Sequence, residues 1–112
     1  MFTVLLDNGH GVNTPGKCSP KKDDGTRFRE WKYNRVIAKQ VVDILKEYDY
    51  DARLVVRENT DISLGERVRR INKVVQQYGA GNCLMISVHA NAAGSNDQWM
   101  SARGWSAWTT RG

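Results

Sequence analysis

The two histidines of this chain, His10 and His89, each follow directly after a run of apolar residues typical of a buried β-strand. Glu30 begins a segment with helical periodicity and lies on the face that we expect to pack against a sheet. A carboxylate at such a position is costly unless another group pairs with it. Two imidazoles and one carboxylate form the ligand set of a catalytic zinc site, which keeps a fourth position open for water. These residue types therefore favour a metal site.

The same histidines are also compatible with ordinary hydrogen-bonded loop residues, because the three candidate ligands come from separate segments and form no compact motif. Other chemical motifs are incomplete. Gly9 and Gly11 follow a strand-like run, but Thr14 stands where a dinucleotide-binding fingerprint needs its third glycine. Cys18 and Cys83 belong to no C-x-x-C pair, which argues against a cysteine metal site.

Apolar periodicity predicts the elements that position these residues. Phe2–Leu6, Arg53–Arg57 and Cys83–Val88 are predicted strands, and the first and third are continuous apolar runs typical of strands buried on both faces. Glu30–Tyr48 is a predicted helix, and a second helix opens with a capping box at Ser63. This order predicts an α/β fold: an open, mostly parallel, twisted sheet with flanking helices in a single domain. The carboxyl ends of such strands share one rim, where ligands bind.

Three further features complete the prediction. The polar stretch Val12–Arg29 is predicted to be a long surface loop on that rim. Gly104–Thr110 is predicted to be a fourth strand. Arg67, Arg69 and Arg70 are interpreted as part of a solvated helix face.

Length and charge limit the classes of function. The chain has 112 residues, about the size of one domain, so residues 1–112 are expected to form one unit. Its formal net charge of +5 favours anionic partners. No apolar run approaches the roughly 20 residues that a membrane helix needs. The start of the chain lacks the basic leader and cleavage site of a signal peptide.

Four blocks of residues stand in order along nearly the whole chain: Val4–Gly11, Glu30 with Asn34, Arg57–Leu64 with Arg67, and Ile86–Ala92. Together they resemble the zinc-dependent N-acetylmuramoyl-L-alanine amidases of the amidase 3 type. This resemblance implies that His10, Glu30 and His89 bind Zn²⁺. It also implies a substrate, the amide that joins the lactyl group of N-acetylmuramic acid to the L-alanine of the peptide stem, and a metal-activated water that attacks its carbonyl.

The resemblance also bears on the residues around the metal. Four residues are predicted to orient the ligands or to contact substrate: Asp7, Asn34, Ser87 and Asn91. In the family a second glutamate, in a strand near the end of the domain, protonates the leaving amine. No glutamate follows Glu66 in this chain. We therefore expect the catalytic glutamate, the remaining strand and the terminal helix to lie beyond Gly112, and we assign no catalytic residue.

The sequence thus predicts a partial catalytic domain of a peptidoglycan amidase. Peptidoglycan is the expected partner, with no nucleic acid and no membrane involved, and a monomer is expected. The enzyme would act on the bacterial cell wall, either as a secreted protein or as a phage-type lysin released from the cytoplasm. The alternative is a non-catalytic, metal-containing module that binds the cell wall or another polyanion.

Overall fold

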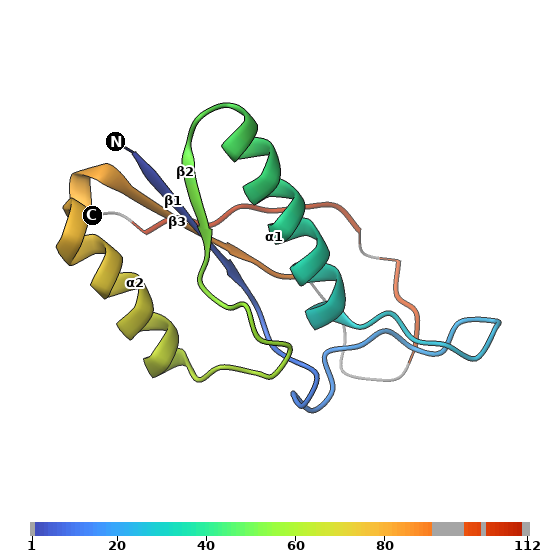
Figure 1. The fold of residues 1–112 in the computed structure, drawn as a ribbon. Coiled ribbons are helices and arrows are strands. Elements are labelled where there is room, and N and C mark those ends of the chain that lie inside the picture. The colour runs from blue at the N-terminus through green and yellow to red at the C-terminus, as the bar shows by residue number, and fades with distance from the viewer. Residues whose placement is uncertain (1, 91–97, 102, 111–112) are drawn as a thin grey trace.

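A parallel sheet lies at the centre of the computed structural model, which describes residues 2–90, 98–101 and 103–110 (Figure 1). Along the chain the elements are β1 (Thr3–Asn8), α1 (Glu30–Glu47), β2 (Asp51–Leu54), α2 (Leu64–Tyr78), a 3₁₀ turn η1 (Ala80–Asn82) and β3 (Cys83–Val88). The strand order is β2-β1-β3, and both pairings are parallel. The predicted open α/β sheet with flanking helices is therefore confirmed. No helix in the described ranges is long and apolar enough to cross a membrane.

The central strand β1 is buried by a helix on each face. Val4 and Leu6 pack in one cluster with Ala38 and Val42 of α1. Leu5 points to the opposite face, as alternation along a strand requires, and packs in a second cluster that includes residues of α2. Burial of such a side chain stabilises the fold by about 1.5–3 kcal/mol. The carboxyl end of β1 is thereby fixed at the rim of the sheet.

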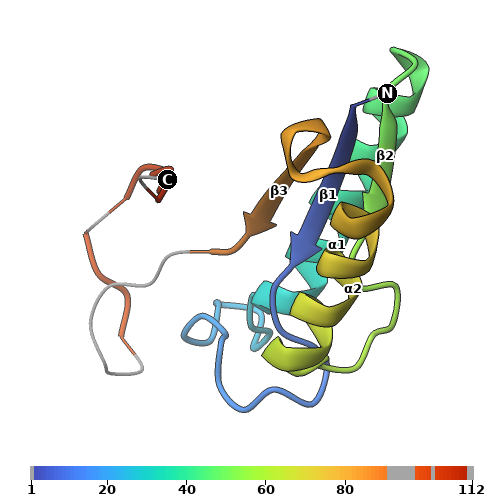
Figure 2. The same ribbon diagram turned by 90° about the vertical axis from the view of Figure 1, so that its left-hand side faces the viewer.

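The edge strand β3 differs from its prediction as a strand buried on both faces. Leu84, Met85 and Ile86 are 41–47% exposed. The strand pairs with β1, in a register that runs from Thr3↔Cys83 to Asn8↔Val88. Figure 2 shows β3 at the edge of the sheet, and α1 packs mainly on β1 and β2. The described part of the chain therefore covers its apolar side chains only in part.

The predicted strand at Gly104–Thr110 is wrong, because residues 103–110 have no regular secondary structure. Trp105 and Trp108 are 89% and 90% exposed. Strand propensity reflects packing on a pleated, half-buried surface. Figure 2 shows this segment apart from the sheet, where neither a ladder partner nor a covering face is available.

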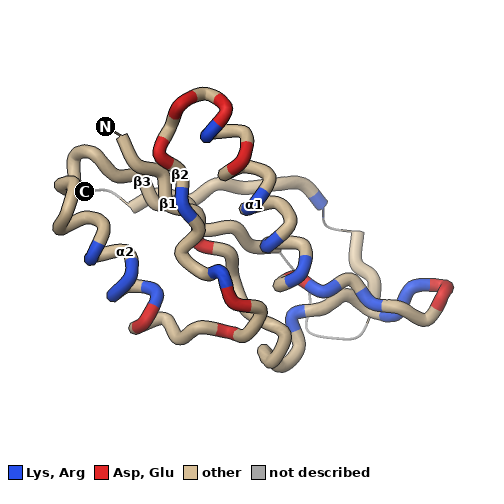
Figure 3. The backbone as a smooth tube through the Cα atoms, viewed as in Figure 1, with Lys and Arg blue, Asp and Glu red and all other residues tan. Residues whose placement is uncertain are grey.

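The predicted surface loop contains a hairpin, residues 18–29. Cys18 and Arg29 form an antiparallel bridge, and the backbone N–H of Ser19 donates to the carbonyl of Phe28 at 2.8 Å. Figure 1 shows the hairpin projecting beyond the first turn of α1, and Figure 3 shows basic residues along it. The loop is thus partly ordered by its own hydrogen bonds.

Candidate metal centre

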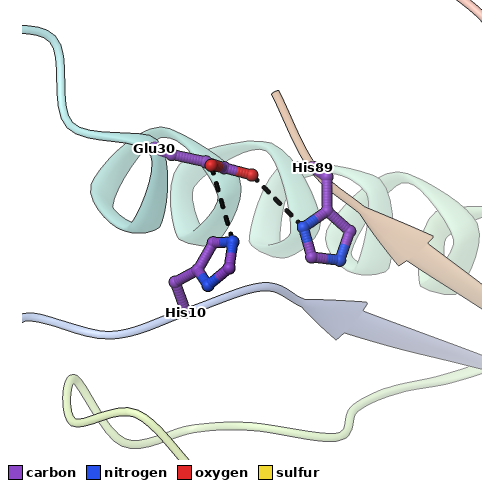
Figure 4. A group of neighbouring side chains, drawn as sticks. All are labelled: His10, Glu30 and His89. Carbon is purple, nitrogen blue, oxygen red and sulfur yellow. Dashed lines mark hydrogen bonds and ion pairs between the residues drawn. The ribbon is translucent and has the colours of Figure 1, made fainter. Parts of the chain in front are cut away.

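His10, Glu30 and His89 converge at the carboxyl-end rim of the sheet (Figure 4). One donor atom from each lies within 4.8 Å of the others. The two oxygens of Glu30 reach separate rings, with Oε2 3.5 Å from Nε2 of His10 and Oε1 3.2 Å from Nδ1 of His89. The ring centroids are 5.2 Å apart and the ring planes meet at 75°. The structure therefore brings together the three ligands that the sequence predicts.

The carboxylate of Glu30 is buried in the first turn of α1, where the helix dipole favours a negative charge. The backbone N–H of Ala90 donates to its Oε1 at 2.8 Å. Asn34, one turn along the helix, is fully buried, and its Nδ2 lies 3.5 Å from the same oxygen and 3.4 Å from the carbonyl of Gly9. These contacts satisfy a carboxylate that would otherwise be costly to bury.

Two glycines on either side of His10 allow close contacts, one with the ring of His89 and one with the backbone at Asp61. A Cβ on Gly9 would lie 2.3 Å from Cε1 of His89, so the imidazole occupies space that any other residue would fill. A Cβ on Gly11 would lie 2.0 Å from the backbone nitrogen of Asp61. Between these glycines, His10 has a φ of 63°, in the left-handed region that few non-glycine residues adopt. The backbone is shaped to hold both rings close together.

The donor set and the exposure of the rings fit a metal ion with an open coordination position. Two imidazole nitrogens and a carboxylate oxygen suit zinc. The side chain of His10 is 22% exposed and that of His89 is 47% exposed, whereas that of Glu30 is 8% exposed. The centre is therefore anchored on the protein side and open to solvent beside His89.

A buried arginine joins the elements around the centre. Arg67, in the first turns of α2, donates from Nη1 to Oδ1 of Asp7 at 2.6 Å and to the carbonyl of Asn8 at 2.7 Å. Its Nη2 donates to Oδ1 of Asp61 at 3.2 Å, and its Nε donates to the carbonyl of Ile62 at 2.7 Å. Prediction of Arg67 as a solvated residue is wrong, because these four partners compensate the burial of its charge.

The loop that carries His10 is held from the other side by the same network. Thr14 accepts a hydrogen bond from the backbone N–H of Gly11 at 2.9 Å and donates to Oδ2 of Asp61 at 2.6 Å. The hydrogen bond from the Thr14 hydroxyl, and to a smaller extent the one from Arg67, lowers the pKa of Asp61 below its usual value. The ionised carboxylate thus ties the loop around His10 to α2.

A second arginine, Arg35 of α1, links this helix to the loop after β2 and to the end of β1. Arg35 lies 5.5 Å from the ring centroid of Trp31, and its Nε donates to the carbonyl of Glu58 at 2.9 Å. Its Nη1 is 3.5 Å from the carbonyl of Gly9. Desolvation by burial lowers the pKa of Arg35. The strand end before His10 is therefore held from the α1 side as well.

The predicted supporting residues have different outcomes. Asn34 touches Glu30, as described above. Asp7 and Ser87 are joined by a hydrogen bond, with Ser87 Oγ donating to Asp7 Oδ2 at 3.0 Å, and Asp7 also accepts from Arg67. Asn91 lies outside the described residues. Arg67, Arg35 and Asp61 were missed as supporting residues, although Arg67 shares one helical face with two partly buried residues, Ile71 and Val74.

The family model of the N-acetylmuramoyl-L-alanine amidases matches residues 4–111, nearly the whole chain. The chain belongs to this amidase family. None of the curated proteins matches it in sequence.

Two solved structures share the fold. The catalytic domain of CwlV, an N-acetylmuramoyl-L-alanine amidase from Bacillus (Paenibacillus) polymyxa var. colistinus, is 29% identical, with a TM-score of 0.64, and the match covers 85% of this chain. Cwp6 from Clostridium difficile is 26% identical, with a TM-score of 0.67 and 82% of this chain covered. The chain spans 48% of the CwlV domain and 13% of Cwp6.

Proposed function

We propose that this chain is part of a zinc-dependent amidase domain that hydrolyses the bond between N-acetylmuramic acid and L-alanine in peptidoglycan. One observation carries the proposal: His10, Glu30 and His89 place their donor atoms within 4.8 Å of one another in a chain of the amidase family. On this proposal residues 1–112 form a partial catalytic domain that acts as a monomer on the bacterial cell wall. It would be secreted or released as a phage-type lysin, with no nucleic acid or membrane as partner.

The protein's own groups have definite roles in this reaction. His10, Glu30 and His89 would hold the ion, which when bound supplies a Lewis acid that activates water and polarises the amide carbonyl. Asn34 and the backbone N–H of Ala90 hold Glu30 in one orientation. The exposed side of His89 leaves room for the scissile amide. Departure of the amine still requires delivery of a proton to its nitrogen.

The second candidate is a metal-containing module that binds the cell wall or another polyanion without cleaving it. One observation favours it. Within the described ranges, the group that could hold a metal contains one carboxylate, Glu30, and no second acidic side chain belongs to it. Cleavage of peptidoglycan separates the candidates, because only the amidase releases new L-alanine amino termini.

Zinc titration tests the metal site itself. The wild-type chain is expected to take up one zinc ion, while His89→Ala should bind it more than about 100-fold more weakly, exceeding the roughly 10- to 100-fold loss typical of an outer-shell change. Lys73→Ala, an exposed change on α2, serves as the control and should bind like the wild type. A wild-type chain without zinc uptake, or unchanged affinity in His89→Ala, would show the assignment to be wrong.

A further inference from the structure

The hairpin of residues 18–29 has a defined shape beside the candidate metal centre. Besides the hydrogen bond near its base, the backbone N–H of Lys22 donates to the carbonyl of Thr26 at 2.7 Å, close to the tip. Asp24 closes the tip by accepting from the backbone N–H of Thr26 at 2.9 Å and from its hydroxyl at 2.7 Å. This acidic side chain is therefore engaged within the tip, which leaves the flanks of the hairpin to its basic residues.

Positive charge is concentrated on this hairpin and the residues next to it. Residues 17–32 contain six Lys and Arg against three Asp and Glu, a net charge of +3 in a chain whose formal net charge is +5 (Figure 3). We call residues 17–32 the cationic arm. Four of its basic residues are exposed and form no ion pair with any described residue: Lys17, Lys21, Arg29 and Lys32.

The basic residues of α2 contrast with the cationic arm. Arg69 pairs with Glu66 at 2.7 Å, and Arg70 pairs with Glu58 at 2.6 Å. Their charge is largely neutralised within the protein, so it offers little attraction to an external anion. The unpaired charge of the arm remains available to a partner.

The base of the arm adjoins the metal centre. The backbone N–H of Glu30 donates to the carbonyl of Lys17 at 3.1 Å, and Arg29 directly precedes Glu30 as the N-cap of α1. The backbone of Glu30, a candidate metal ligand, is therefore joined to Lys17 by a hydrogen bond and to Arg29 by a peptide bond, and neither basic residue has an ion-pair partner among the described residues. The base of the arm is therefore next to the segment that carries Glu30.

We propose that the cationic arm binds the carboxylates of the peptide stem in the substrate. This inference rests on the proposed amidase function, because the stem begins at the bond to be cleaved. A peptide carries at least its terminal carboxylate, and the guanidinium of Arg29 offers the paired donors that carboxylates accept. The arm then contributes to substrate affinity and orientation, and not to the chemical step.

Equilibrium binding of free stem peptides tests the arm without any cleavage. The probes are an L-alanine-initiated stem peptide with free carboxylates and the same peptide with its carboxylates converted to carboxamides. Wild type should prefer the carboxylate form, and Lys17→Glu/Arg29→Glu should bind that form about 10-fold more weakly, since two exposed charges are reversed. The difference should shrink at about 1 M salt, where screening acts over about 3 Å.

Lys73→Glu/Arg103→Glu is the matched control, with one exposed Lys and one exposed Arg reversed outside the arm. It should keep the wild-type preference within about 2-fold. Equal binding of both peptides by wild type, retention of the preference in Lys17→Glu/Arg29→Glu, or an equal loss in the control would overturn the proposal. If that variant fails to fold, Lys21→Glu/Lys32→Glu replaces it under the same criteria.

Two additional measurements distinguish this proposal from binding of another polyanion and from failure of the amidase function itself. Inorganic polyphosphate serves as a third probe, and a tighter, Lys17- and Arg29-dependent affinity for it than for the carboxylate peptide would overturn the assignment to the peptide stem. Cleavage of peptidoglycan by wild type is assayed separately. Absence of any cleavage by the zinc-loaded wild type, even with an added buffer acid, together with a retained peptide preference would contradict the amidase function alone, because the free stem peptide lacks the scissile bond.

Discussion

At the scale of single residues, the buried Arg67 links the segments that carry the two histidines. Arg67 binds Asp7, whose other oxygen accepts from Ser87, two residues before His89. It also binds Asp61, which connects through Thr14 to the loop that carries His10. One guanidinium thus bridges the backbone segments of both imidazoles. Outer contacts of this kind orient metal ligands.

Replacement of Arg67 by lysine should weaken zinc binding by about 10- to 100-fold, because lysine keeps the charge but cannot form the same fork of hydrogen bonds. The measurement is a zinc competition titration, combined with thermal unfolding of the zinc-free protein. Arg70→Lys is the control, since Arg70 also pairs with two carboxylates of α2 and its preceding loop, Glu58 and Glu66. Equal zinc affinities in Arg67→Lys and wild type would contradict this positioning role.

The sequence predicts the ligands better than the residues that support them. His10 and His89 stand at the ends of apolar runs, and Glu30 lies on the inner helix face, so the rim of a parallel sheet already brings them together. Arg67 was misread because charge usually indicates solvent exposure. Its burial depends on carboxylates from distant segments, Asp7 and Asp61, and a local pattern does not reveal such pairing.

At the scale of elements, the first turns of α2 are attached to the loop after β2 by ion pairs. Arg70 contacts Glu58 at 2.6 Å and Glu66 at 3.1 Å. Hydrogen bonds from Arg70 lower the pKa of Glu58 to about 2. Hydrogen bonds from Arg69, and then from Arg70, lower the pKa of Glu66 to about 2. Both carboxylates are therefore ionised in the folded protein at any pH above this value.

These shifted pKa values predict an acid-sensitive contribution to stability. Above about pH 4.5, the ordinary pKa of glutamate, both groups are ionised in the folded and unfolded chains and the contribution is complete. As the pH falls from there to about 2, the unfolded chain takes up protons first, so the contribution is lost.

Chemical denaturation at several pH values measures this effect. Glu58→Gln/Glu66→Gln should show a smaller decrease in the free energy of unfolding between about pH 4.5 and pH 2 than wild type. Asp43→Asn, which removes an exposed pair with Lys39 on α1, is the control and should follow the wild-type curve closely. Parallel curves for wild type and the double variant would contradict the role assigned to this network.

The elements follow the sequence closely where local and long-range preferences agree. β3 and both helices occur where periodicity predicts them, and Ser63 caps α2 by accepting from the N–H of Glu66 at 3.2 Å. β2 lies at Asp51–Leu54, earlier than predicted, although the apolar Val55 and Val56 are buried beyond it. Burial of apolar residues alone therefore does not show that they belong to a hydrogen-bonded strand. The predicted strand at Gly104–Thr110 is wrong for the same reason, because a strand also needs a neighbouring strand with which it can form hydrogen bonds.

At the scale of the whole molecule, the candidate metal centre would supply the nucleophile of the proposed reaction, but among the described residues it includes no second acidic side chain that could protonate the leaving amine. The last two glutamates in the chain are Glu58 and Glu66. Both have pKa values of about 2 and are paired with arginines, so near neutral pH they are ionised and poor proton donors. The resemblance to the family predicts a further glutamate for this step, and no glutamate follows Glu66 in this sequence.

We therefore predict that the zinc-loaded 112-residue chain hydrolyses muramoyl-peptides slowly and that an added acid accelerates it. General acid catalysis is typically worth about 10²- to 10⁴-fold, and part of this factor should return as the concentration of a buffer acid rises. A hindered pyridinium is the appropriate acid, since it donates a proton but coordinates metal poorly. Its effect is measured as turnover at constant pH and ionic strength.

Glu58→Gln and Glu66→Gln should leave the slow rate unchanged, because neither carboxylate belongs to the metal centre. If turnover is instead fast, does not depend on the concentration of the buffer acid and is strongly reduced in Glu58→Gln, that glutamate is the proton donor.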